Sequence, residues 1–139
     1  MSRKFAILEL LAIAAMAAGL TPALAEEIDA SLIGAWATSS AECERLFESR
    51  DGAPPYRQPV DKFAQAAIIS AREILLPAST CRLKSASRDG DTVKLSAECN
   101  DSVSYTSQNT AIKIQSATEI VYSPTGDPTL ATTFVKCAR

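Results

Sequence analysis

Polar and apolar residues alternate with a period close to two along much of the second half of the chain. The alternation runs through Val93–Cys99, Ser102–Thr106 and Ala111–Gln115, and a last strand rich in β-branched residues is expected at Thr129–Cys137. Turn-forming residues interrupt this pattern at intervals of roughly ten residues, which is typical of antiparallel β-meanders. We therefore predict a mainly β fold, a small antiparallel meander or barrel of about eight strands with one short N-terminal helix.

The short helix is predicted directly after a first strand at Ser31–Ala37. Ser39 and Glu42 have the spacing of an S-x-x-E capping box, which marks the beginning of a helix. Three apolar residues then occupy positions i, i+3 and i+4 of one helical face: Cys43, Leu46 and Phe47. Asp51-Gly52 ends the predicted helix, and a proline-containing loop follows it.

Residues 61–76 allow two interpretations. The segment is rich in helix-forming residues and ends at Pro77, as a helix does. It is also apolar on too many sides for a surface helix, and it divides into two strands, Ala66–Ile69 and Glu73–Leu76, around a Ser70-Ala71-Arg72 turn. Because the downstream chain has β character, we favour the hairpin.

The N-terminus has the features of a cleaved export signal. A basic head, Met1–Lys4, precedes an apolar stretch, Phe5–Leu20, and Ala23–Ala25 supplies the small-x-small pattern of a cleavage site. A membrane anchor is the weaker interpretation, because the stretch is shorter than the roughly 20 residues that span a bilayer and contains Glu9. We expect cleavage before residue 26, one mature domain at 26–139, no membrane span after cleavage, and a periplasmic or secreted location.

The cysteines are expected to form two disulfides. All four, Cys43, Cys81, Cys99 and Cys137, lie in the mature chain, and an exported protein meets an oxidising compartment. Zinc binding is a weak alternative without histidine or a C-x-x-C pair. Three pairings are possible, but a hairpin centred on Gly90 places Cys81 opposite Cys99 and leaves Cys43 for Cys137. This register needs a three-residue loop with a bulge, since a two-residue turn would shift it by one.

Charge and composition exclude several functions. Without Arg3, Lys4 and Glu9, the 14 basic and 16 acidic residues fall to 12 and 15, and no basic stripe remains to bind nucleic acid. The absence of histidine rules out histidine-dependent triads and metal sites. No pair of carboxylates stands out as an acid–base couple. We therefore predict no catalytic, cofactor-binding or metal-binding residue, and we expect a non-enzymatic protein.

The sequence Gly34-Ala35-Trp36, followed by Cys43, resembles the G-x-W opening of calycin-type barrels and of the bacterial alkaline-protease inhibitor family. The resemblance implies a structural role for Gly34 and for Trp36, which would plug one end of a barrel. A longer likeness, to uncharacterised small secreted proteins of alphaproteobacteria, implies no known activity. Its motifs beyond the leader and the G-A-W-A-T-S start are Ser79-Thr80-Cys81, Asp89-Gly90-Asp91, Ala97-Glu98-Cys99 and Phe134-Val135-Lys136-Cys137.

Three functions agree with these features. The first is a monomeric binding module that holds a small apolar ligand in its interior, or presents loops 50–60 and 123–128 to an envelope protein. The alternative is an inhibitor of a protease or other hydrolase that acts through Glu26–Ser31. The third is an envelope protein that contributes stability or stress tolerance. A packed or hollow interior would separate a protein binder from a ligand carrier.

Overall fold

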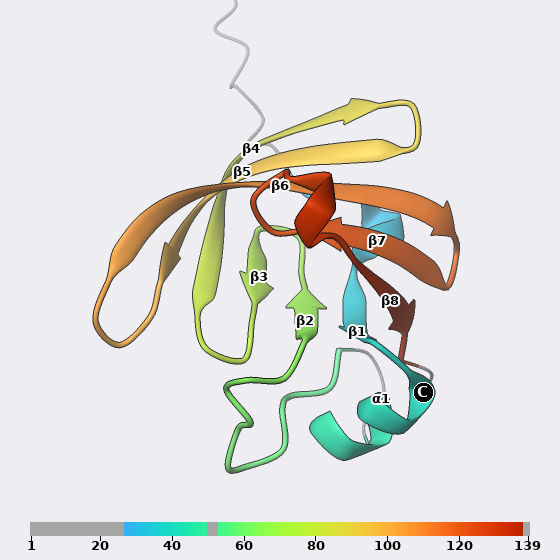
Figure 1. Cartoon of the computed structure of the whole chain (residues 1–139), viewed down its shortest axis with the longest axis vertical. Coiled ribbons are helices and arrows are strands. Elements are labelled where there is room, and N and C mark those ends of the chain that lie inside the picture. Colours follow the sequence, from blue (N-terminus) through green and yellow to red (C-terminus); the bar gives the residue numbers. More distant parts are fainter. Residues whose placement is uncertain (1–26, 50–52, 138–139) are drawn as a thin grey trace, which may run out of the picture.

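The computed structural model describes residues 27–49 and 53–137; the predicted leader and cleavage site lie outside these ranges. Eight antiparallel strands form a closed barrel in sequence order, which confirms the predicted fold (Figure 1). Within the described ranges there is one α-helix, together with two short 3-10 helices. The elements are η1 (Ala30–Leu32), β1 (Gly34–Ala37), α1 (Ser40–Leu46), β2 (Ala66–Ile69), β3 (Glu73–Leu75), β4 (Thr80–Asp89), β5 (Thr92–Asn100), β6 (Tyr105–Ser116), β7 (Glu119–Ser123), η2 (Pro128–Leu130) and β8 (Thr132–Lys136).

The ambiguous segment 61–76 forms the hairpin. Strands β2 and β3 pair with Ile69 opposite Ile74, and the N–H of Ser70 donates to the carbonyl of Glu73 at 2.9 Å across the turn. Helix α1 begins as the capping box predicts, since Ser39 Oγ accepts from the N–H of Glu42 at 3.2 Å. In both places the local pattern and the tertiary packing agree.

The first and last strands begin later than predicted, for the same reason. Asp29 Oδ1 accepts from the N–H of Ser31 at 2.9 Å and caps η1, so β1 begins only at Gly34. Asp127 Oδ1 accepts from the N–H of Thr129 at 2.8 Å and caps η2, so β8 begins at Thr132. An aspartate side chain that bonds the backbone two residues ahead competes with strand formation.

In the β4–β5 hairpin, the predicted three-residue turn is wrong, but the predicted pairing of Cys81 with Cys99 is confirmed. Its turn has two residues, so Asp89 lies opposite Thr92. A bulge between Leu83 and Ser85 shifts the register back by one residue, and Cys81 lies opposite Cys99. The two disulfides are Cys81–Cys99 and Cys43–Cys137, with Cα–Cα distances of 3.9 and 5.4 Å.

Side chains from all eight strands fill the barrel interior. Trp36 is fully buried, and its indole Nε1 donates to the carbonyl of Leu32 at 2.8 Å. The rings of Tyr122 and Phe134 stack with centroids 5.5 Å apart. The buried strand residues of this core are Trp36, Ala67, Ile69, Ile74, Cys81, Val93, Leu95, Ala97, Cys99, Ile112, Ile120, Tyr122 and Phe134.

Gly34 has an unusual backbone conformation and lies beside the side chain of Lys136. Its φ is +144°, and a Cβ at this position would lie 2.9 Å from Cε of Lys136. The lysine passes over the glycine, donates through Nζ to the carbonyl of Ser31 at 3.2 Å, and lies 5.2 Å from the centroid of the Trp36 ring. The glycine of the G-x-W motif is therefore explained by its backbone conformation, because the lysine Cε belongs to a flexible side chain that can move aside for a Cβ.

A second core lies outside the barrel. Helix α1 and the loop that leads to β2 lie together at the lower end in Figure 1, and they pack against the outer faces of β1 and β2. Phe47 and Tyr56 stack with ring centroids 5.0 Å apart, and the Tyr56 hydroxyl donates to the carbonyl of Leu75 at 2.9 Å. Cys43–Cys137 links α1 to the end of β8 beside this core.

Candidate functional site

Helix α1 and the loop that leads to β2 cover the outer faces of β1 and β2, and we call them the outer cover. The candidate site lies at the border of this outer cover. Five register pairs place six residues in one row across β1–β6: Ala35, Ile68, Leu75, Thr80, Asn100 and Tyr105. Ala35 and Ile68 are buried beneath the helix and loop, Leu75 is half-buried, and Thr80 and Asn100 are exposed. The outer face thus changes from covered to open within one row of neighbouring strands.

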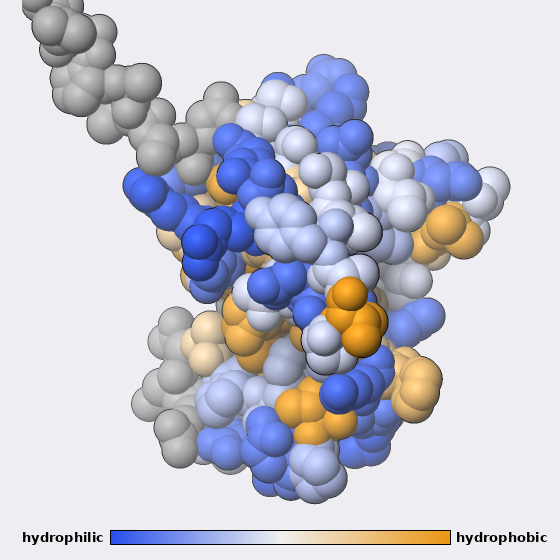
Figure 2. Space-filling view, turned by 90° about the vertical axis from the view of Figure 1, so that its left-hand side faces the viewer, coloured by the Kyte–Doolittle hydropathy of each residue, from blue (hydrophilic) through white to orange (hydrophobic). Residues whose placement is uncertain are grey.

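A groove of about 500 Å³ follows this boundary, and we call it the lateral groove. Ile68 and Leu75 contribute its apolar floor, the β3–β4 turn lies at one end, and one wall is formed by four residues of the loop at 55–60: Pro55, Tyr56, Gln58 and Val60. Residues 100–102, at the β5–β6 hairpin tip, form the opposite wall. Figure 2, which looks onto this side, shows apolar surface gathered around the waist between the polar sheet above and the helix and loop below.

Phe63 projects into solvent beside the groove. Its exposed fraction is 98%, and its neighbour Lys62 lines the groove. Asp61 holds this turn, because its Oδ1 accepts from the N–H of Phe63 at 3.1 Å and its carbonyl accepts from the N–H of Ala64 at 3.1 Å. Arg45 Nη1 donates to Asp61 Oδ2 at 3.0 Å, and this guanidinium lowers the pKa of the Asp61 carboxyl.

Val103 occupies an equivalent position on the opposite rim. It is 91% exposed, and its neighbours Asp101 and Ser102 line the groove. Asp101 Oδ1 accepts from the N–H of Val103 at 2.8 Å and from the N–H of Ser104 at 2.7 Å. These backbone donors lower the pKa of Asp101 because they bind the ionised form better than the neutral one.

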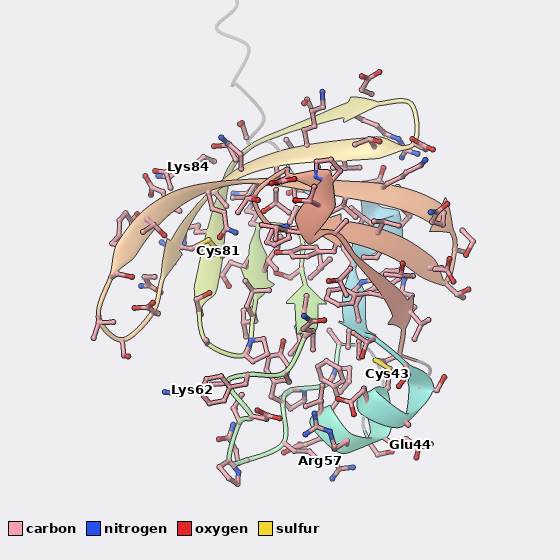
Figure 3. The ribbon with its side chains drawn as sticks, in the orientation of Figure 1. Cys43, Glu44, Arg57, Lys62, Cys81 and Lys84 are labelled. Carbon is pink, nitrogen blue, oxygen red and sulfur yellow. A yellow bond between two sulfur atoms is a disulfide. The ribbon has the colours of Figure 1, made fainter. Side chains whose placement is uncertain are left out.

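The two rims therefore have the same local structure, an aspartate turn followed by an exposed apolar residue. In each, an aspartate accepts from the backbone N–H of the residue two positions ahead, and the apolar side chain of that residue projects into water. Figure 3 shows Lys62 on the loop below the β3–β4 and β5–β6 tips, with its side chain directed outward beside them. Because the backbone of each turn is already held, a partner that covers these side chains orders little additional backbone.

The outer face of the long strands β4–β6 has a different character. Lys84 Nζ lies 2.7 Å from Glu98 Oε2, and the Tyr105 hydroxyl donates to the same carboxylate. The hydrogen bond from Lys84 is the largest cause of the lowered pKa of Glu98. The side chains of Lys84 and Glu98 both remain in contact with solvent. A depression of about 350 Å³ on this face is lined by serines, Lys94 and Asn109. Exposed ion pairs of this kind contribute little to stability and mark a solvated surface.

The N-terminal segment considered from the sequence is part of the barrel. Ile28 is 4% exposed and lies in the interior core with Leu32. Asp29 forms an ion pair with Arg88 on β4, and the N–H of Ile28 donates to the carbonyl of Ala71 at 2.8 Å. Residue 26 lies outside the described ranges. The described part of the segment therefore closes one end of the barrel.

The two loops considered from the sequence are tied to their neighbours. In loop 50–60, of which residues 50–52 lie outside the described ranges, Arg57 Nε donates to the carbonyl of Glu44 at 3.0 Å, and both residues are labelled in Figure 3. In loop 123–128 the Pro124 carbonyl accepts from Gln108 Nε2 at 2.5 Å and from Thr110 Oγ1 at 3.1 Å. Only the wall in the loop at 55–60 belongs to the lateral groove.

Phe63 and Val103 were not singled out by the sequence. The alternating pattern placed Val103 within a strand, whereas it lies in the hairpin turn, and Phe63 belonged to the ambiguous segment 61–76. A signal was present in both cases, since Asp61-Lys62-Phe63 and Asp101-Ser102-Val103 have the spacing of an aspartate turn followed by an apolar residue.

Among residues 27–49 and 53–137, no three histidine, cysteine or acidic side chains gather in a group that could hold a metal ion. No helix in those ranges is long and apolar enough to cross a membrane. In comparisons with known proteins, no family model, curated protein or solved structure matches the chain. Proposals about function therefore rest on the sequence and structure of this chain.

Proposed function

We propose that the protein is an exported, non-enzymatic binding module that recognises a protein partner through the lateral groove and its two rims. The observation that carries the proposal is the pair of apolar side chains, Phe63 and Val103, which project from hydrogen-bonded turns and are 98% and 91% exposed beside an apolar groove. Apolar surface that remains uncovered in a small protein is a common feature of interaction sites. Two projecting side chains with a groove between them suit a partner that has a ridge and two shallow pockets.

The packed interior supports recognition at the surface. Side chains from every strand meet inside the barrel, and Trp36, Ile69, Ile112 and Ile120 are fully buried there. A carrier of small apolar ligands needs an internal cavity or a deep mouth. The filled core favours a protein partner over the apolar ligand considered from the sequence.

The cross-links support an extracytoplasmic location. Both disulfides are compatible with an exported protein, because such bonds persist in oxidising compartments. Residues 1–25 have the pattern of a cleaved leader. We therefore place the partner in the periplasm or outside the cell.

The placement of the N-terminal segment argues against the inhibitor alternative. An inhibitor that acts through Glu26–Ser31 must extend this segment into the active site of its target. Ile28 and Leu32 lie in the barrel core on either side of the capping residue Asp29. Extending the segment would remove apolar side chains from that core, so the groove is the better candidate for contact with a partner.

Site-specific photocrosslinking in the host tests this function. Benzoylphenylalanine is placed at Phe63, at Val103, or at Leu130, a control side chain that is 55% exposed on η2. We expect positions 63 and 103 to crosslink to the same protein, identified by mass spectrometry, and position 130 to give no such adduct. The double variant Phe63→Ser/Val103→Ser, which removes no buried contact, should then fail to bind the purified partner. Identical adducts at all three positions, or none at 63 and 103, would overturn the proposal.

A further inference from the structure

A second surface, separate from the lateral groove, lies along one edge of β6. Strand β6 pairs with β5 from Tyr105 onward but with β7 only from Ala111 onward. Within the described chain, no strand therefore borders the other edge of β6 over its first six residues. An edge of this kind presents backbone donors and acceptors that another strand can pair with.

This edge lacks the features with which proteins discourage strand addition. Its register with β5 runs without a bulge from Tyr105 to Lys113, and residues 102–112 contain no charged side chain and no proline. Strand β4, which also extends beyond its neighbour β3, carries a bulge after Leu83 and the charged residues Lys84 and Arg88. Charges and bulges are the usual means of protecting an edge. Tyrosine and threonine, in contrast, favour strands.

The hydrogen-bond pattern identifies which groups face outward. The N–H of Asp101 donates to the carbonyl of Ser104 at 3.1 Å and closes the β5–β6 hairpin. Hydrogen-bonded and non-bonded pairs alternate along an antiparallel ladder, so Thr106 bonds to β5 while the N–H and C=O groups of Tyr105 and Ser107 face away from it. The 3.9 Å Cα–Cα distance of Cys81–Cys99 agrees, because close spacing is typical of non-bonded pairs and directs the Cys99 backbone groups toward Thr106.

The open part of the edge is short. Asn109 is the next residue whose backbone faces outward, and its carbonyl lies only 3.9 Å from the place where a Cβ on Gly126 would be. Loop 123–127 thus approaches the edge at Asn109, and the side chain of Gln108 donates to Pro124 in that loop. Two residues, Tyr105 and Ser107, remain for pairing with an incoming strand.

We propose that this edge binds a second copy of the chain, antiparallel, across a two-fold axis at Thr106. Tyr105 then pairs with Ser107 of the second copy and Ser107 with Tyr105 of the second copy, which uses all four outward donors and acceptors on each side. The two Thr106 side chains lie opposite each other, a favourable cross-strand pair. Because residues 102–112 are uncharged, the symmetry brings no like charges together in this segment.

A two-fold arrangement limits the assembly to two copies. Both edges are covered by the same contact, so the assembly closes at two copies and β4–β5–β6 continues into its symmetry mate as one six-stranded sheet. This inference goes beyond the proposed function and departs from the monomer expected from the sequence. It uses the β6 edge, so Phe63 and the groove floor stay available to another partner.

Sedimentation velocity of the purified, disulfide-bonded protein over a concentration series tests the dimer with a matched pair of variants. Ser107→Ala removes the hydroxyl and keeps the backbone N–H, whereas Ser107→Pro removes that donor at an edge position where proline is tolerated. We expect the unmodified protein and Ser107→Ala to dimerise equally, and Ser107→Pro to dimerise at least about tenfold more weakly. Monomers at every concentration, or equal dimerisation of the two variants, would refute the proposal.

Hydrogen exchange supplies a readout that needs no substitution. The amides of Tyr105 and Ser107 should become more protected as the protein concentration rises. The Thr106 amide, which bonds to β5, should be protected at every concentration. Tyr105 and Ser107 amides whose exchange does not depend on concentration would overturn the assignment of this edge even if Ser107→Pro failed to fold. Failure of the groove to crosslink a partner would leave this result unaffected.

Discussion

The two halves of the barrel are built differently. Strands β1–β3 have four, four and three residues, whereas β4, β5 and β6 have ten, nine and twelve. The short strands pack on the interior core with one face and, through β1 and β2, on the helix and loop with the other. The long strands extend beyond their neighbours (Figure 1). Their exposed outer face carries mainly polar residues.

This difference suggests that one half of the barrel mainly stabilises the fold and that the other mainly presents side chains and backbone groups to partners. Residues buried on both faces of a sheet contribute hydrophobic free energy in proportion to the area that they remove from water. The long strands, by contrast, end in a turn that exposes Val103, and one of them has an unpaired edge. We infer that substitutions in the short-strand half act mainly on folding and that those at the ends of the long strands act mainly on recognition.

Removing each disulfide gives the largest expected effects and compares the two halves directly. Cys43–Cys137 spans 94 residues and Cys81–Cys99 spans 18. In the chain-entropy model, losing the long loop costs about 4–5 kcal/mol and losing the short one about 3 kcal/mol. Urea denaturation of Cys43→Ala/Cys137→Ala and of Cys81→Ala/Cys99→Ala should therefore rank the first as less stable. The reverse order would mean that the interior packing of Cys81 and Cys99 outweighs chain entropy.

Truncating one aromatic residue in each half gives the next contrast. Trp36→Ala should lower the free energy of unfolding by about 3–5 kcal/mol, because the indole is fully buried and would leave a cavity. Tyr105→Ala should change it by less than about 0.5 kcal/mol, since Tyr105 is 65% exposed. Denaturant titration measures both. A Trp36→Ala protein as stable as the parent would exclude the role of Trp36 as a core plug.

The β4–β5 hairpin shows what a periodic pattern can and cannot predict. The alternation around Gly90 identified the inward face and the cysteine pair, because side-chain direction in a strand depends only on local periodicity. The bulge at Lys84 left no trace in that pattern. A two-residue turn plus a bulge inside β4 gives the same cysteine register as a three-residue loop, so the expected pairing was reached through a different geometry.

The candidate site was harder to predict because exposure is decided by distant parts of the chain. An apolar pattern treats Phe63 and Val103 as core candidates. Their exposure depends on the outer cover ending near Leu75 and on aspartates that hold both turns open. Tyr56 shows the opposite case: it lies in loop 50–60, which the sequence suggested as a partner-binding loop, but it is only 8% exposed because it packs in the outer core. Only the aspartate-turn spacing could have indicated the two rims.

Changes at Asp101 are expected to have the smallest effect on stability. They test how the turn presents the Val103 side chain to solvent. Because backbone donors lower the pKa of Asp101, the braced turn is present above the unfolded value of about 3.9 and is lost as the pH falls through the lower folded value. The amide resonances of Val103 and Ser104 should therefore titrate with a midpoint below the pKa of an unfolded aspartate. Asp101→Asn, which keeps an acceptor oxygen, should abolish this titration and leave the Tm unchanged.

The effect of Asp101→Ala on the Tm tests whether this turn only presents Val103 to a partner or also stabilises the fold. We expect rapid amide exchange at Val103 and Ser104, an unchanged Tm, and weaker crosslinking from position 103, because the turn lies beyond the core and its carboxylate accepts from exposed groups, the N–H of Val103 and the N–H and hydroxyl of Ser104. Asp61→Ala should act in the same way at Phe63, with the added loss of its contact to Arg45. A fall in Tm comparable to that of Trp36→Ala would instead make these aspartates part of the folding framework, and the separation between the two halves would no longer hold.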